Sequence, residues 1–139
     1  KEGIKKAISY FKNPILQFHG DESQDFCASF NLPYIKAISM NEKDFQNKII
    51  EFGDAFAILL DSGSPKIRGG TGKTFDWKLI PKEIKNNLII AGGLNSNNIT
   101  SLIKSYKPYG VDLASGVESK PGKKDIAELK HFLKIVDEI

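Results

Sequence analysis

Two side chains suited to proton transfer or substrate hydrogen bonding stand at the ends of apolar runs in this sequence. Asp61 ends AFAILLD (55–61), and His19 directly follows PILQF (14–18). At the end of a buried strand an aspartate can act as a general acid, or it can simply cap the following loop. A histidine there can donate a hydrogen bond to a ligand, or it can be an ordinary turn residue. Position alone leaves both alternatives open for each residue.

A second group of residues has the composition of an anion-binding site. Gly92 and Gly93 end one apolar run, and Ser115 and Gly116 follow another, each pair just before an expected helix. Glycines let backbone N–H groups approach a ligand closely, and helix N-termini favour anions. In eight-stranded barrels a short extra helix near the last two strands often completes a phosphate site, and residues 115–125 can supply that turn. The alternative is that these glycines are ordinary residues of the loops between strands and helices, but two such pairs on neighbouring strands favour phosphate binding.

The segment IRGGTGKTFDW (67–77) resembles the end of a nucleotide-binding P-loop. A P-loop needs a glycine five residues before the glycine of its Gly-Lys-Thr, and that position holds Ile67. The failed count argues against nucleotide binding, so the glycine-rich loop must have another role. The residues of this loop are Gly69, Gly70, Thr71 and Gly72.

Length and composition predict one domain over residues 1–139, with 40% hydrophobic residues for a core. The net charge is only +3 and no basic block stands out, so we expect no nucleic-acid partner. No apolar run approaches the roughly 18 residues that span a membrane. The single cysteine, Cys27, excludes an internal disulfide, suits a reducing compartment and predicts a cytoplasmic protein. We expect Cys27 to be a core residue, and no His and Cys spacing predicts a metal site.

The elements that position these residues repeat as a strand followed by a helix. Strands are expected at 14–18, 34–40, 55–61, 88–93 and 110–115. Helices are expected at 4–11, 21–30, 41–52, 77–85, 95–106 and 125–139. Asn41 and Asn95 are the expected caps of two of these helices. Four residues of the last helix are expected to face inward: Ile126, Leu129, Leu133 and Val136.

Repeated βα units form either an open doubly wound sheet or a closed barrel. In both architectures the active site lies at the carboxyl ends of the strands, where the candidate residues stand. Five such units cannot close an eight-stranded barrel, which needs at least about 200 residues.

Four segments of the sequence resemble the phosphoribosylanthranilate isomerase family, in the order and spacing of that family. They are LQFHGDES (16–23), LLDSGSPKIRGGTGKTFDW (59–77), IIAGGLNSNNI (89–99) and GVDLASGVESKPGKKD (110–125). The resemblance implies an α/β fold of the (βα)8 TIM barrel family. It also implies that this chain covers about five βα units, strands four to eight, as the C-terminal portion of the barrel.

The resemblance implies a cofactor-free isomerase of tryptophan biosynthesis. Its reaction is the Amadori rearrangement of N-(5'-phosphoribosyl)anthranilate, a small phosphosugar, to 1-(o-carboxyphenylamino)-1-deoxyribulose 5-phosphate. The general acid of the family matches Asp61, and two substrate-binding residues match His19 and Asp112. The phosphate-binding positions match Gly92, Gly93, Ser115 and Gly116. The glycine-rich loop at 69–72 matches the family's active-site loop, which folds over the substrate.

Two functional residues of the family have no match in this sequence. One is the general base, a cysteine in a CGI-type motif at the end of strand one, and the other is an arginine early in the barrel. Cys27 and Arg68 lie at other positions, so we expect the chain alone to be inactive. The alternatives are a non-catalytic phosphate-binding half-barrel fragment and another phosphosugar isomerase barrel. The chain is expected to be a monomer or a homodimer, without membrane or nucleic-acid partners.

Overall fold

The structure is a computed structural model that describes residues 2–63 and 74–139. Within these ranges five parallel strands form one sheet in sequential order, which confirms the predicted α/β class. The strands are β1 (Leu16–Phe18), β2 (Tyr34–Ser39), β3 (Ala57–Asp61), β4 (Asn87–Ile90) and β5 (Gly110–Val111). The helices are α1 (Glu2–Ile8), α2 (Gln24–Ala28), α3 (Phe45–Glu51), α4 (Ile99–Tyr106) and α5 (Ile126–Asp137). The 3-10 turns are η1 (Trp77–Leu79) and η2 (Ser115–Val117), and the hairpin strands are β6 (Glu118–Lys120) and β7 (Lys123–Lys124).

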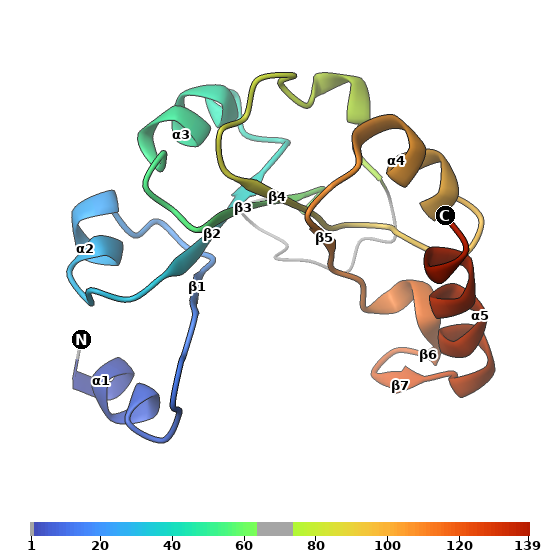
Figure 1. Cartoon of the computed structure of the whole chain (residues 1–139), viewed down its shortest axis with the longest axis horizontal. Coiled ribbons are helices and arrows are strands. Elements are labelled where there is room, and N and C mark those ends of the chain that lie inside the picture. The colour runs from blue at the N-terminus through green and yellow to red at the C-terminus, as the bar shows by residue number, and fades with distance from the viewer. Residues whose placement is uncertain (1, 64–73) are drawn as a thin grey trace.

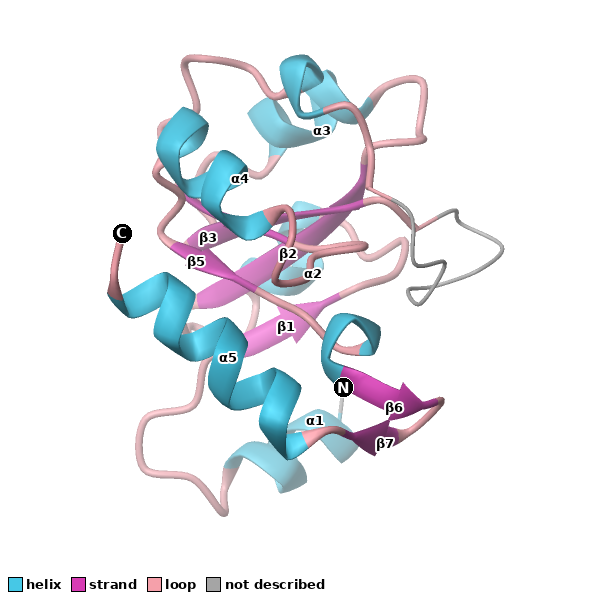
Figure 2. Ribbon diagram, turned by 90° about the vertical axis from the view of Figure 1, so that its right-hand side faces the viewer, coloured by secondary structure: helices cyan, strands magenta, loops and turns pink. Residues whose placement is uncertain are grey.

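The sheet is curved, and α2, α3 and α4 lie along its outer side (Figure 1). Its central strand, β3, is buried at every residue, as expected for a parallel strand that is apolar on both faces. The outer strands β1 and β5 each pair with a single neighbour among the described strands. The antiparallel hairpin β6–β7 and helix α5 follow β5 outside this sheet (Figure 2).

Alternation along the strands divides the apolar side chains between two cores. Ile38 and Leu60 belong to the larger core, which includes side chains of α3, α4 and α5. Ala37, Leu59 and Ala91 form a second, smaller cluster. Successive strand residues point to opposite faces, so this smaller cluster lies on the face of the sheet turned away from the helices.

Several predicted boundaries are wrong. The helix expected at 77–85 is only the single 3-10 turn η1, and the last strand contains two residues rather than six. Asn41 does not cap α3, whose N-cap is Asp44, and Asn95 does not cap α4, whose N-cap is Asn98. Both asparagines instead bond to loop backbone, an alternative that short polar side chains readily offer. The hairpin β6–β7 was not predicted.

The predicted inward face of the last helix is partly wrong. Ile126 and Leu133 are 62% and 51% exposed, whereas Leu129 and Val136 pack against the larger core. Phe132, which the prediction omitted, is the fully buried residue of α5. The sequence period locates an apolar stripe, but the neighbours of the helix decide which side of that stripe is covered.

The described part of the chain contains neither a candidate membrane-spanning helix nor a candidate metal site. No helix there is long and apolar enough to cross a membrane. No group of three or more His, Cys, Asp or Glu side chains in residues 2–63 and 74–139 is arranged to hold a metal ion.

Candidate functional site

Asp61 is the last residue of β3 and is 6% exposed. It shares a strand face with Leu59, two residues earlier, and therefore points to the side of the sheet opposite the helices. Its Oδ1 accepts a hydrogen bond of 3.1 Å from the backbone N–H of Gly63. A buried carboxyl group thus stands at the carboxyl end of the central strand with one fixed donor.

His19 follows β1 and reaches the same carboxyl group from two strands away. Its Nε2 lies 3.9 Å from Asp61 Oδ2, and 42% of the histidine side chain is exposed. The two predicted residues are 42 positions apart in the chain and are brought together by the strand order β1-β2-β3. A protonated imidazole in this position would form an ion pair with the carboxylate.

A cavity of about 90 Å³ lies at the carboxyl ends of β3, β4 and β5. Six predicted site residues line it: Asp61, Gly92, Gly93, Asp112, Ser115 and Gly116. The remaining lining residues are Ala91, Leu94, Leu113 and Ala114. The structure therefore places the predicted acid, Asp112 and the pairs Gly92–Gly93 and Ser115–Gly116 around one cavity.

The glycines of this cavity are required by geometry at two places. Gly92 has a φ of +85°, and a Cβ there would lie 2.1 Å from Ser62 Oγ and 2.7 Å from the Ser62 nitrogen. A Cβ on Gly116 would lie 1.7 Å from the carbonyl oxygen of Leu94. Both residues allow loops from neighbouring strands to approach within backbone contact.

Ser115 and Gly116 lie in η2, so the extra turn predicted within residues 115–125 is present. The turn is a 3-10 helix of three residues, followed by the hairpin β6–β7 rather than directly by the last helix. Lys124, in β7, reaches back across the hairpin, and its Nζ donates to the carbonyl oxygen of Ala114 at 2.6 Å. The hairpin thereby holds the loop between β5 and η2.

Sequence reasoning missed the asparagines that hold the loop after β4. The side-chain amides of Asn95 and Asn98 both donate to the carbonyl oxygen of Gly93, at 3.2 and 3.0 Å. The Asn98 side chain also accepts from the backbone N–H of Asn95 at 3.0 Å. The polar run NSNN (95–98) was the sequence signal that could have indicated these contacts. It marks a loop whose side chains fold back onto its own backbone.

Ser62 is a further residue that the sequence did not single out. It is 7% exposed, and its Oγ has no hydrogen-bond partner among the described residues. Ser39, the last residue of β2, does not line the cavity; its hydroxyl donates to the carbonyl oxygen of Gly63.

The other candidates lie away from this site or outside the described residues. Cys27 is fully buried in the larger core, as predicted, and burial raises the pKa of its thiol. Arg68 and the glycine-rich loop at 69–72 lie outside the described residues.

A larger cavity, of about 690 Å³, opens beside the starts of β4 and β5. Lysine, tyrosine and asparagine side chains line it, but no carboxylate or histidine does. Despite its size it lacks an acid–base pair, whereas the small cavity lies at the edge of the sheet where parallel α/β proteins bind ligands.

A parallel α/β sheet with carboxylates and glycine loops at its carboxyl edge defines a ligand-binding protein of the barrel or doubly wound class. The family model described as N-(5'-phosphoribosyl)anthranilate (PRA) isomerase matches residues 1–135. The chain belongs to this family.

Curated relatives agree with this assignment. The chain is 50% identical over 134 residues to an N-(5'-phosphoribosyl)anthranilate isomerase of Legionella pneumophila (strain Corby), covering 96% of the chain and 65% of that protein. It is 40% identical over 133 residues to the protein of the same name from Hahella chejuensis, covering 95% and 62% respectively. The chain thus spans less than two thirds of the length of these relatives.

Solved structures of the same family share the fold. The phosphoribosyl anthranilate isomerase of Thermotoga maritima matches with a TM-score of 0.84 at 34% identity, covering 99% of this chain and 68% of that one. A phosphoribosyl anthranilate isomerase in complex with reduced 1-(o-carboxyphenylamino)-1-deoxyribulose 5-phosphate matches with a TM-score of 0.80 at 32% identity, covering 99% and 66%.

Proposed function

We propose that this chain forms strands four to eight of a (βα)8 isomerase that converts N-(5'-phosphoribosyl)anthranilate to 1-(o-carboxyphenylamino)-1-deoxyribulose 5-phosphate. The observation that carries the proposal is the cavity that Asp61 and Asp112 share with the Gly92–Gly93 and Ser115–Gly116 pairs, in a chain of this family. The relative solved with a reduced form of that product supports the substrate class.

Asp61 is the proposed general acid. The reaction begins when a proton reaches the ring oxygen of the ribose, so that the bond between C1′ and the ring oxygen breaks and an iminium ion forms. A base then removes the C2′ proton to leave a neutral enol, and this enol becomes the ketone as its hydroxyl loses a proton and C1′ takes one up. The burial of Asp61 and its contact with Gly63 N–H fix the carboxyl group at the cavity wall.

The phosphate group is proposed to lie against Gly92, Gly93, Ser115 and Gly116. Their place around one cavity at the carboxyl ends of the strands supports this role, because glycine N–H groups without side-chain cover bind phosphate well. His19 and Asp112 are the proposed contacts to the rest of the substrate. His19 lies within reach of Asp61, and Asp112 lines the cavity.

The proposed general base lies outside this chain, in the amino-terminal strands of the barrel. β1 and β5 each pair with one neighbour among the described strands, which supports this, since further strands of a closed barrel would pair with both. The coverage of only 65% of the Legionella relative agrees with it. We therefore propose that residues 1–139 are a single C-terminal portion of the barrel and do not catalyse the reaction alone.

The test is turnover of N-(5'-phosphoribosyl)anthranilate by two proteins, the chain alone and the chain joined to the amino-terminal segment of the Legionella relative. We call the second protein the completed enzyme. Activity is expected only in the completed enzyme, and Asp61→Asn is expected to remove it. Turnover by residues 1–139 alone would show that the base is within the chain. A folded completed enzyme that binds phosphate without turnover would replace the isomerase proposal by a phosphate-binding barrel.

A further inference from the structure

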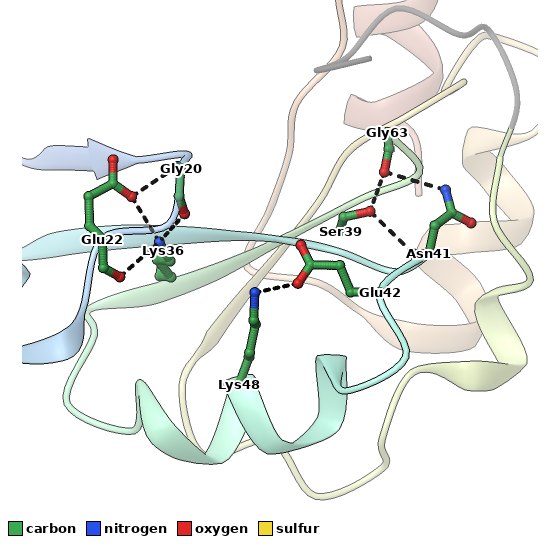
Figure 3. A network of polar contacts seen from close by, with 8 residues as sticks. All are labelled: Gly20, Glu22, Lys36, Ser39, Asn41, Glu42, Lys48 and Gly63. Carbon is green, nitrogen blue, oxygen red and sulfur yellow. Dashed lines mark hydrogen bonds and ion pairs between the residues drawn. The ribbon is translucent and has the colours of Figure 1, made fainter. Parts of the chain in front are cut away.

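Strand β2 lies between β1, which His19 follows, and β3, which ends at Asp61. Polar side chains of β2 and of the residues just after it reach the loops on both sides (Figure 3). On one side Lys36 contacts the loop after β1. On the other, Ser39 and Asn41 contact the loop after β3. None of these three residues lines the small cavity, so they are available for a structural role toward its catalytic groups.

Asn41 holds the peptide unit that hydrogen-bonds to Asp61. Its Nδ2 donates to the carbonyl oxygen of Ser62 at 2.6 Å, and the N–H of Gly63 donates to Asp61 Oδ1 at 3.1 Å. The Ser62 carbonyl and the Gly63 N–H belong to the same planar peptide unit, so fixing one end fixes the other. Ser39 holds the next peptide unit, because its hydroxyl donates to the carbonyl oxygen of Gly63.

Glu22 and Lys36 hold the two successive peptide units that follow His19. The Gly20 N–H, in the same peptide unit as the His19 carbonyl, donates to Glu22 Oε2 at 2.9 Å. Lys36 Nζ donates to Gly20 O at 2.7 Å and lies 2.9 Å from Glu22 Oε2. Lys36 is 3% exposed and lies 5.0 Å from the centre of the Phe52 ring, so its ammonium group has little freedom to move.

We propose that β2 and the loop directly after it position the His19–Asp61 pair from both sides, with Asn41 orienting the donor to Asp61 and the Lys36–Glu22 pair fixing the turn after His19. The inference rests on the proposed isomerase function for its kinetic consequences, but the geometry that it describes can be measured separately. Lys36 and Asn41 are positioning residues that act through backbone groups, because neither lines the cavity in which the substrate is proposed to bind.

The experiment compares Lys36→Met and Asn41→Ala in the completed enzyme with two matched controls. Lys48→Met makes the same change in the ion pair with Glu42; Lys48 interacts electrostatically with Asp21 but, among the described residues, makes no hydrogen bond to either loop (Figure 3). Asn47→Ala makes the second change on the exposed surface of α3. The readouts are kcat and KM measured separately, and the NMR signal of the His19 imidazole, assigned by its loss in His19→Gln.

We expect kcat to fall roughly 10- to 100-fold in Lys36→Met and Asn41→Ala, because a displacement of about 1 Å at a catalytic group has effects of this size. KM is expected to stay within about twofold in Asn41→Ala, since the phosphate-binding residues follow β4 and β5. Lys36→Met should also raise KM, because His19 is a proposed substrate contact. The His19 signal should move in Lys36→Met, and Lys36→Arg should restore part of both effects. The controls should leave kcat and the His19 signal unchanged.

If both test variants keep the kcat and the His19 signal of the unsubstituted completed enzyme, the proposal is overturned, even if their melting temperatures fall. If Lys36→Met fails to fold, Glu22→Gln tests the same contact with nearly the same side-chain volume. If the unsubstituted completed enzyme shows no turnover, the isomerase proposal fails. In that case the His19 signal of the variants still decides whether β2 fixes the turn after His19.

Discussion

Gly116 is the residue of the proposed phosphate site at which an added methyl group should cause the most severe steric clash. An alanine Cβ would lie 1.7 Å from the Leu94 carbonyl oxygen and 2.9 Å from its carbon, whereas real Cβ contacts essentially never fall below 3.0 Å. The two segments must therefore separate by at least 1.3 Å, the difference between 3.0 and 1.7 Å. Leu94 is 1% exposed and packed in the larger core, so the strain falls on backbone that has little room to move.

We expect Gly116→Ala to destabilise the folded state by about 3 kcal/mol, the upper end of the usual range for overpacking. For a protein of about 150–250 residues this corresponds to a fall in melting temperature of roughly 6–12 °C. The displaced loop should also bind inorganic phosphate at least about tenfold more weakly. Thermal unfolding and phosphate titration of the completed enzyme measure the two effects.

Gly122→Ala is the matched control, because Gly122 has a φ of +79° but nothing within 4 Å of its Cβ position. It occupies the turn between β6 and β7 after Pro121, where a type II turn favours glycine. Its substitution should cost about 1–2 kcal/mol, from backbone conformation alone, and leave phosphate binding intact. A Gly116→Ala protein that melts no lower than Gly122→Ala would refute the reasoning from the Leu94 contact.

Three further predictions concern titratable groups. Asp61→Asn in the completed enzyme should lower kcat by about 10²–10⁴, the usual contribution of a general acid, with an unchanged circular dichroism spectrum; a loss under about threefold would exclude the general-acid role. Burial alone would raise the pKa of Glu22, but the hydrogen bonds from Lys36 and the Gly20 N–H outweigh it and lower that pKa below its ordinary value of 4.5. The stability from Glu22 is therefore present above pH 4.5 and lost as pH falls below it, so Glu22→Gln should flatten the acid side of a stability–pH curve measured by urea unfolding. Burial, and then its hydrogen bond to Asp54, raise the pKa of Tyr34 above its ordinary value of 10.0, so its contribution is present below pH 10 and lost as pH rises further. Tyr34→Phe should lose less stability than the parent between about pH 9 and 11 in the same unfolding experiment, and an identical alkaline slope would contradict the assignment.

The sequence by itself determined the class of fold and the edge of the sheet at which the site lies. Unbroken apolar runs such as 55–61 predict parallel strands, because a strand buried on both faces has no polar alternation. The residues that end those runs then fall at the carboxyl edge by topology alone. That rule was sufficient to select Asp61, Gly92–Gly93 and Ser115–Gly116, all of which line one cavity, whereas Asp112 was selected only by the family resemblance. The missing glycine at Ile67 argued against a nucleotide-binding P-loop, a prediction on residues outside the described part of the chain.

Only the tertiary structure decided which polar residues hold the site in place. The sequence analysis assigned no role to Lys36 and predicted Asn41 to be a helix cap. Their partners, Gly20 and Ser62, lie 16 and 21 positions away, so no local period relates them. In the same way α5 covers Phe132 and leaves Leu133 exposed, since the packing of α5 on the larger core selects the buried side. Local patterns record what each segment must bury, whereas distances between loops depend on strand order and on contacts between residues far apart in the chain.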